Sequence, residues 1–88
     1  MVRGNVTVIN KAGLHGRAAS KLVTLTSTFT SNIQVGHKKM VDGKSILSLM
    51  MLAAGQGTKL TIETNGSDEQ QALEATLALI NDGFGEPE

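Results

Sequence analysis

The sequence predicts an α+β fold, an open-faced two-layer sandwich in which three helices cover one face of a four-stranded antiparallel sheet. Two kinds of apolar spacing support this prediction. Some short segments alternate apolar and polar residues, which is typical of strands with one buried face. Others repeat apolar residues every three or four positions, which is typical of amphipathic helices. These segments follow the order βαββαβα, and the length suits one small domain, so residues 1–88 are expected to form a single domain.

The first strand is predicted over residues 5–9, because Val6 and Val8 alternate there with their neighbours. After a loop at residues 10–13, apolar side chains recur at intervals of four, three and four, which indicates a helix that begins near Gly16. The core face of this helix is predicted to carry four apolar side chains: Ala18, Leu22, Leu25 and Phe29.

A hairpin and a short helix are predicted in the middle of the chain. The second strand covers residues 33–35 and the third covers residues 40–41, with a turn at residues 36–39 between them. A helix over residues 45–52 follows. Its core face is predicted to carry Ile46, Leu49 and Leu52.

The last strand and the last helix complete the predicted order. Alternating residues indicate a strand over residues 59–63. Ser67 is predicted to cap the following helix, with Gln70 completing a capping box, and Gly83 is predicted to end the helix in the left-handed conformation. Residues 86–88 are expected to form a frayed tail. The core face of the helix is predicted to carry Leu73, Leu77, Ile80 and Phe84.

Composition excludes several classes of function. Eight Lys and Arg residues balance eight Asp and Glu residues, so the net charge is zero and a nucleic acid or an acidic membrane is not an expected partner. The chain has no cysteine, which excludes disulfides, thiol catalysis and thiolate metal sites. No apolar run is long enough for a signal peptide or a membrane span, so we expect a cytoplasmic protein.

The stretch over residues 13–19 could carry chemistry, because it joins the first strand to the first helix and places His15 at the helix start. A neutral imidazole is a nucleophile near neutral pH, and a helix N-terminus presents unpaired N–H groups to an anion. Arg17 adds a permanent cation, and Gly16 leaves space beside the histidine. The alternative is that His15 is an ordinary loop residue and Arg17 a solvated charge.

Three stretches of the chain, Gly13–Arg17, Lys44–Leu47 and Asn65–Glu69, resemble the HPr family, the histidine-containing phosphocarriers of the bacterial sugar phosphotransferase system. The resemblance implies the same open-faced sandwich, acting as a carrier and not as an independent enzyme. It also implies that His15 accepts a phosphoryl group on Nδ1 from enzyme I, charged by phosphoenolpyruvate, and passes it to an enzyme IIA domain for sugar uptake. The backbone N–H groups of Gly16 and Arg17 and the Arg17 side chain are expected to stabilise the phosphoryl charge.

The resemblance extends equally to the nitrogen-branch carrier, a regulatory phosphocarrier without sugar transport, and this alternative stays open. No cofactor and no metal are expected, and we expect a monomer. The family usually has Ala and Pro where this chain has Gly16 and Ala18, so the helix start is expected to be looser. A KH-type RNA-binding loop is a further alternative for residues 13–16, but the zero net charge argues against it.

Two further sites are predicted outside the histidine loop. Ser45 is either the N-cap of its helix or a regulatory serine, because the resemblance implies phosphorylation there by an HPr kinase/phosphorylase. His37, in the hairpin turn, is expected to be a solvated residue and not half of a metal pair with His15. A partner-binding patch beside the histidine is predicted to contain Leu14, Ala19, Leu47, Met50 and Gln56.

Overall fold

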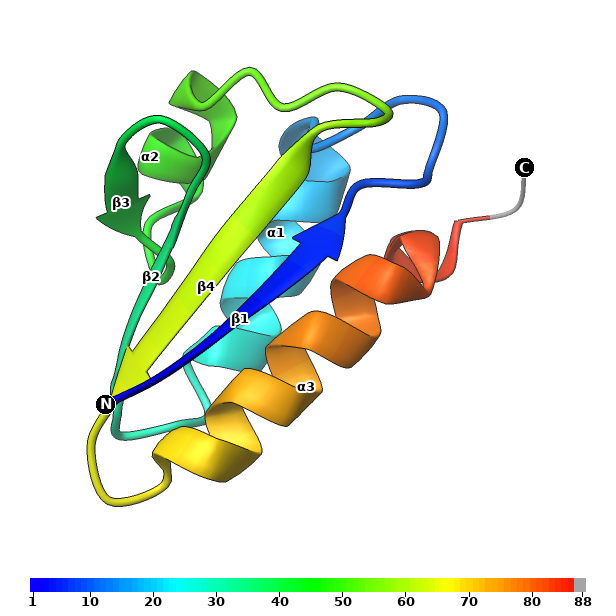
Figure 1. Ribbon diagram of the computed structural model, residues 1–88. Coiled ribbons are helices and arrows are strands. Elements are labelled where there is room, and N and C mark those ends of the chain that lie inside the picture. The colour runs from blue at the N-terminus through cyan, green and yellow to red at the C-terminus, as the bar shows by residue number, and fades with distance from the viewer. Residues whose placement is uncertain (87–88) are drawn as a thin grey trace.

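A computed structural model describes residues 1–86 of the chain; Pro87 and Glu88, which belong to the predicted frayed tail, lie outside the described residues. Within residues 1–86 the predicted order of strands and helices is confirmed (Figure 1). The elements are β1 (Val2–Thr7), α1 (Gly16–Thr26), β2 (Asn32–Gly36), β3 (Met40–Asp42), α2 (Ile46–Met51), β4 (Lys59–Asn65), α3 (Glu69–Asn81) and a 3₁₀ turn, η1 (Gly83–Gly85). No helix in this part of the chain is long and apolar enough to cross a bilayer.

The four strands form one antiparallel sheet in the order β1-β4-β2-β3, so β4 is flanked on both sides and β1 lies at an edge. The register places Val2 of β1 opposite Thr64 and Thr7 opposite Lys59. Figure 1 shows α1 and α3 running across one face of this sheet, with α2 beside the β2–β3 hairpin. The predicted α+β open sandwich is therefore confirmed.

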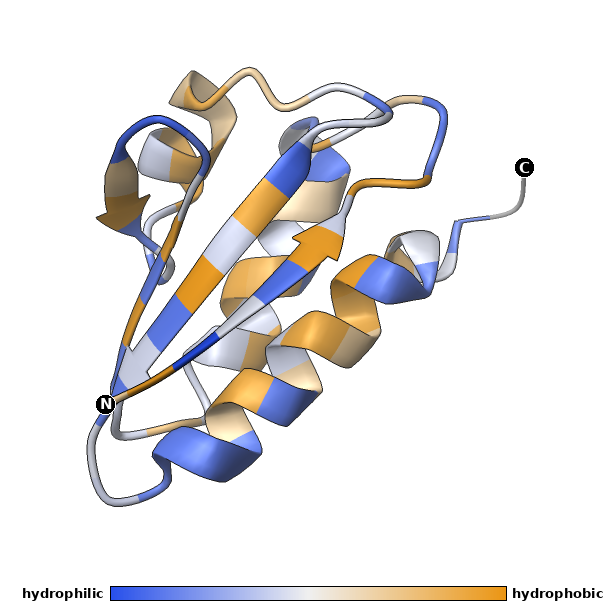
Figure 2. Cartoon of the chain, viewed as in Figure 1, coloured by the Kyte–Doolittle hydropathy of each residue, from blue (hydrophilic) through white to orange (hydrophobic). Residues whose placement is uncertain are grey.

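The core lies between the sheet and the helices. Alternate residues of β2 and β4 are buried, and Figure 2 shows this alternation as bands of high and low hydropathy along β4. The opposite face of the sheet carries polar side chains. On it Arg3 pairs with Glu63 at 2.5 Å, and the Thr61 hydroxyl donates to Asn5 at 2.9 Å. The apolar side chains that meet in the core include Leu22, Ile33, Val35, Leu60, Ile62, Leu73 and Ile80.

Some element boundaries and one core assignment differ from the prediction. β1 covers residues 2–7 and not 5–9, because its pairing with β4 begins at Val2 and ends at Thr7. α1 ends at Thr26, so Phe29 lies beyond the helix, and both Leu25 and Phe29 are only half-buried. Thr26 is fully buried instead, and its hydroxyl donates to the carbonyl of Gly43 at 2.8 Å. The α2 side chain of Ile46 is 41% exposed, so the prediction that it faces the core is wrong; this short helix buries only Leu49.

The start of α3 lies one residue later than predicted. Asp68, and not Ser67, is the N-cap, and Gln70 donates to Glu74 instead of forming a capping box. The Asp68 carboxylate makes no cap bond because it accepts hydrogen bonds from the Ser31 hydroxyl and from the Thr30 and Ser31 amides at 3.0 Å. The Ser31 hydroxyl and these amides lower the pKa of Asp68 to about 2. Asp68 therefore ties the start of α3 to the loop after α1.

The chain turns back on itself at the end of α3. Gly83 has a φ of +65°, so the prediction of a left-handed residue there is confirmed. Phe84 does not continue the helix face, because it lies in η1 with a φ of +60°. Its side chain is nevertheless only 1% exposed. The aromatic ring therefore anchors the residues that follow α3 to the core.

Candidate functional site

The loop between β1 and α1 is fixed against the segment that follows α2. Gly13 has a φ of +71°, and a Cβ atom on it would lie 2.5 Å from the carbonyl oxygen of Ala54. The amide of Leu14 donates to the same carbonyl at 2.8 Å. A glycine is required at this close approach, both for its backbone conformation and for lack of space. These contacts fix the residue before the start of α1, which is His15.

His15 is the N-cap of α1, as its position in the sequence predicts. Its Nδ1 atom accepts a hydrogen bond from the Arg17 amide at 3.2 Å, and its Nε2 atom lies 2.6 Å from a carboxylate oxygen of Glu86. An acceptor needs a lone pair, and a partner of a carboxylate needs a hydrogen atom. We therefore assign the neutral ring with the hydrogen on Nε2 and the lone pair on Nδ1. The side chain is 33% exposed, so the ring is accessible.

Glu86 is held in place by a second side chain. The Asn10 amide group donates to Glu86 Oε1 at 2.9 Å and to the carbonyl of Gly13 at 2.8 Å. The hydrogen bond from Asn10 lowers the pKa of Glu86, and His15 and Lys21 act in the same direction against the opposing effect of desolvation. Glu86 is therefore ionised at neutral pH, with its charge directed at the imidazole ring.

The prediction that the frayed tail begins at residue 86 is wrong for Glu86. Its amide donates to the carbonyl of Gly83 at 3.1 Å, and the Lys21 ammonium group donates to the carbonyl of Phe84 at 2.9 Å. Figure 1 shows the β1–α1 loop and the last turn of α3 at the same end of the molecule. Asn10 and Glu86 were not predicted as site residues. The available signal was Phe84 between two glycines, which indicates a chain that turns back toward the core.

The start of α1 offers donors for an anion next to Nδ1. The Ala19 amide makes the first helical hydrogen bond, to the carbonyl of His15 at 2.8 Å, so the amides of Gly16, Arg17 and Ala18 have no helical partner. The Arg17 side chain is exposed and forms no ion pair within residues 1–86. A free guanidinium group and these amides can together bind the oxygens of a phosphoryl group.

The predicted contact patch is correct in part. Leu14 is 4% exposed and Ala19 is fully buried, because both side chains point into the core beneath the helix start. Neither can form a contact surface. Leu47 and Met50 are exposed, and Gln56 is exposed while donating to the carbonyl of Ile9 at 3.0 Å. We define the α2 patch as the exposed apolar residues of this helix: Ile46 (41%), Leu47 (69%), Met50 (46%) and Met51 (76%).

The α2 patch lies directly beside the histidine. A Cβ atom built on Gly16 would lie 3.8 Å from the terminal methyl carbon of Met50, which is ordinary van der Waals contact. The fold itself therefore leaves room for a side chain at position 16. Ser45, the other predicted site, caps α2 by accepting a hydrogen bond from the Ser48 amide at 3.2 Å, so its capping role is confirmed.

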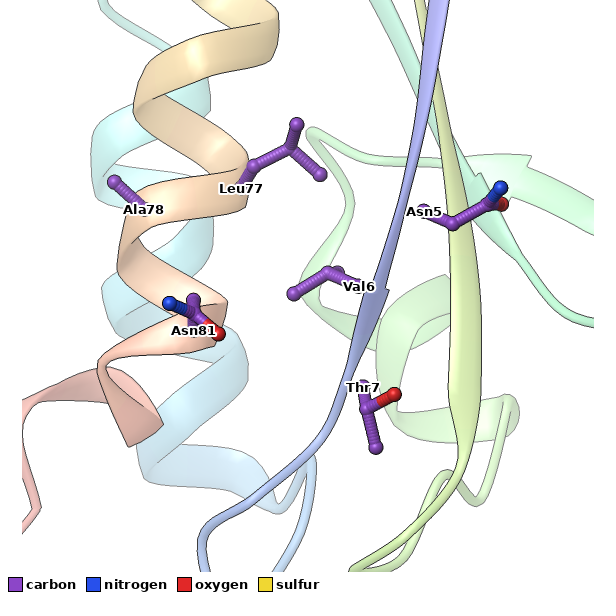
Figure 3. A pocket seen from close by; sticks show the side chains of 6 residues that line it. All are labelled: Asn5, Val6, Thr7, Leu77, Ala78 and Asn81. Atoms are coloured by element: carbon purple, nitrogen blue, oxygen red, sulfur yellow. The ribbon is translucent and has the colours of Figure 1, made fainter.

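Other parts of the molecule offer less chemistry. A groove of about 480 Å³ between β1 and α3 is lined by side chains that do not ionise, among them Val6, Leu77 and Asn81 (Figure 3). His37 lies in the β2–β3 turn near the carbonyl of Leu52. Residues 1–86 contain no cluster of three or more His, Cys, Asp or Glu side chains that could hold a metal ion.

Comparisons with known proteins agree with this geometry. Residues 2–82 match a family model described as the PTS HPr component phosphorylation site. The chain is 49% identical to the phosphocarrier protein HPr of Cupriavidus necator over the full length of both chains. It is 36% identical to the phosphocarrier protein NPr of Proteus mirabilis, over 92% of each chain. A crystal structure of HPr from Thermoanaerobacter tengcongensis superposes with a TM-score of 0.95 at 37% identity, covering both chains completely. The chain belongs to the HPr family of phosphocarrier proteins.

Proposed function

We propose that the chain, as a single domain over residues 1–88, carries a phosphoryl group on His15 between phosphorylated enzyme I and an enzyme IIA domain. The observation that carries this proposal is the orientation of the ring, whose Nδ1 lone pair is directed at the start of α1. Family membership supports the class of partner, because HPr proteins are components of the phosphotransferase system. We place this function in the cytoplasm and assign it to a monomer.

The transfer step requires in-line attack and neutralised charge. The Nδ1 lone pair attacks phosphorus, a bond from phosphorus to Nδ1 forms, and the bond to the nitrogen of the donor breaks. The amide of Gly16, the amide of Arg17, which Nδ1 releases when it attacks phosphorus, and the guanidinium group of Arg17 stabilise the phosphoryl oxygens. In the second transfer the electron pair of the bond returns to Nδ1, and the phosphoryl group leaves for the acceptor. No metal and no organic cofactor takes part in this scheme.

The α2 patch, with Gln56, is the proposed docking surface for both partners. Its apolar side chains are exposed next to the reactive ring, and methionine side chains adapt to partners of different shape. One surface can therefore present His15 first to the donor and then to the acceptor.

The acceptor separates two versions of this function. We favour transfer to an enzyme IIA domain for sugar uptake, because relatives named HPr are more similar to this chain than the relative named NPr. The alternative is a regulatory carrier of the nitrogen branch. Offering the phosphorylated protein to sugar-type and nitrogen-type IIA domains in parallel, and comparing the transfer rates, distinguishes the two.

Ser45 is proposed as a second, regulatory phosphorylation site. It is half-buried at the start of α2, next to the docking surface, so a phosphate there would change the charge of that surface. Incubation with ATP and an HPr kinase/phosphorylase, followed by phosphate mapping, tests this site. Ser48, on the same helix, is the matched serine that should stay unmodified.

Reconstitution tests the main proposal. The protein is incubated with phosphoenolpyruvate, labelled in the phosphoryl group, and with enzyme I, and the label is mapped. His15→Ala should lose all uptake, whereas His37→Ala, which removes the other histidine of the chain, should keep it. Persistent labelling of His15→Ala would refute the assignment.

A further inference from the structure

We propose that Glu86 is a positioning residue for His15. Its carboxylate keeps the proton on Nε2, so that Nδ1 retains the lone pair that attacks phosphorus, and it balances the positive charge of the phosphorylated ring. The proposal rests on the carrier function above and deepens it. It gives a role to a side chain that lies 71 positions from His15 in the sequence.

Two independent contacts favour the same protonation state of the ring. The Arg17 amide, a donor, faces Nδ1, and the ionised Glu86 carboxylate, an acceptor, faces Nε2 at 2.6 Å. Moving the proton to Nδ1 would place two hydrogens between the ring and Arg17, and a lone pair against the carboxylate. Because both contacts oppose that change, the ring is preorganised with its nucleophilic nitrogen at the start of α1.

The side chain of Asn10 holds the Glu86 carboxylate next to the ring. Asn10 is fully buried, and its side-chain NH₂ group donates two hydrogen bonds, one to Glu86 and one to the carbonyl of Gly13. Its side-chain oxygen has no hydrogen-bond partner within residues 1–86. Rotating the side-chain amide by half a turn would point its oxygen at the Gly13 carbonyl and the Glu86 carboxylate, which are both acceptors. The NH₂ group must therefore face these two oxygens. The orientation leaves a buried oxygen unpaired and keeps a donor on Glu86.

Glu86 also stands on a rigid support. Phe84, two residues before it, is buried in the core, and Lys21 of α1 binds the Phe84 carbonyl. The support therefore includes the helix whose start carries His15. This geometry limits the movement of the carboxylate relative to the ring, which a positioning residue requires.

The proton on Nε2 stays in place through the whole transfer cycle. Attack by Nδ1 converts a neutral ring with one hydrogen into a phosphorylated ring that carries the same hydrogen and one positive charge. The carboxylate of Glu86 stabilises that charge as it develops. When the acceptor takes the phosphoryl group, the electron pair returns to Nδ1 and the ring is neutral again. No proton has to be supplied or removed at either step.

The first test measures the ring itself, without any partner. Long-range ¹H–¹⁵N spectra at pH 8.5, well above the ordinary pKa of about 6.5 for histidine, report which ring nitrogen carries the hydrogen. The ratio of Nδ1–H to Nε2–H tautomer should rise about tenfold in Glu86→Ala, the size expected for loss of one charge-assisted hydrogen bond. Glu86→Asp should restore part of the original ratio. Glu74→Gln, which neutralises an exposed carboxylate on α3, should leave it unchanged.

The second test measures phosphoryl uptake from enzyme I. Glu86→Ala should be slower by about ten- to hundredfold, with Glu86→Asp intermediate and Glu74→Gln unchanged. The role is overturned if either the tautomer ratio or the uptake rate of Glu86→Ala stays within twofold of the Glu74→Gln value. If the unsubstituted protein took up no phosphate, the carrier function would fail instead, and the tautomer ratio would still decide whether Glu86 holds the ring.

Discussion

The ammonium group of Lys21 donates a hydrogen bond to the backbone carbonyl of Phe84, 2.9 Å away, and so joins α1 to the segment that follows α3. Lys21 lies six residues after His15 on the same helix, and Phe84 lies two residues before Glu86. The contact links the two supports of the imidazole ring. It explains how a carboxylate close to the end of the described chain can remain next to a histidine near its beginning.

Replacement of Lys21 by Met should loosen this link. Loss of one hydrogen bond costs about 1 kcal/mol, which lowers the Tm of a domain of this size by about 4–8 °C. The Glu86 amide, which donates to Gly83 within the same segment, should exchange its hydrogen faster. Thermal unfolding and hydrogen exchange measure the two effects. An unchanged exchange rate would contradict the supporting role of Lys21.

Arg17→Ala should slow phosphoryl uptake by about tenfold or more without changing the Tm. The Arg17 side chain is exposed and has no ion pair within residues 1–86, so its removal costs the fold nothing that the structure shows. Arg17→Lys should recover only part of the rate, because an ammonium group cannot bind two phosphoryl oxygens in the forked geometry of a guanidinium group. Full activity of Arg17→Ala would show that the helix amides alone suffice.

Two glycines beside His15 should respond in opposite ways to alanine. Gly16→Ala should stabilise the protein by about 0.5–1 kcal/mol, because its backbone is not left-handed and the added methyl meets Met50 at an ordinary 3.8 Å. Gly13→Ala should destabilise it strongly, because its φ is +71° and the new Cβ would lie 2.5 Å from the Ala54 oxygen. Chemical denaturation of both variants measures the difference. Equal effects would mean that the loop adapts to a side chain at position 13.

Leu47→Ala should weaken binding to enzyme I and to the IIA acceptor by about tenfold, because the proposal places this side chain at the centre of the interface, where truncations cost most. Leu47 is 69% exposed, so the fold should be unaffected. Gln71→Ala, an exposed substitution on α3, is the matched control that should leave both affinities unchanged. Calorimetric titration measures them. Unchanged affinity of Leu47→Ala for both partners would place the docking surface elsewhere.

Asp68 should make stability depend on pH in the acid range. Its pKa is about 2 in the folded protein and 3.8 ordinarily, so it stabilises the fold fully above the ordinary value. That contribution is lost as the pH falls from about 4 toward 2, where the folded carboxylate also takes up a proton. Asp68→Asn should therefore lower the Tm at pH 7, and the difference from the unsubstituted protein should shrink near pH 2. Glu74→Gln provides the control, and a difference independent of pH would contradict this account.

The fold could be predicted because β2 and β4 bury the residues of one face, and β1 half-buries alternate residues. Leu60 and Ile62 are both fully buried, as their alternation predicts, and a shift of one residue would turn both to the solvent. Helix ends were harder to predict. Ser67 and Asp68 both suit an N-cap, and the choice between them depends on Ser31, a residue 37 positions before Asp68 whose hydroxyl the Asp68 carboxylate accepts. No local pattern contains that contact.

The same division applies to the candidate site. The position of His15 at a helix start was predictable, because it follows from the change in apolar spacing that begins at Gly16. The burial of Leu14 and Ala19 was not, because apolar residues at a helix start can face either a core or a partner. Glu86 was missed because its role depends on the tertiary fold, through Asn10 and Lys21, and not on neighbouring residues.

The place of Glu86 in the chain decides where a tag or fluorophore can be attached. Because the Glu86 carboxylate contacts His15, a group attached next to Glu86 would lie beside the imidazole ring and could hinder the approach of the proposed partners. β1 begins at the end of the sheet opposite the His15 loop. A label placed before Val2 would therefore be separated from that loop by the length of this six-residue strand, about 20 Å. Kinetic work with a labelled chain should therefore use the amino-terminal end.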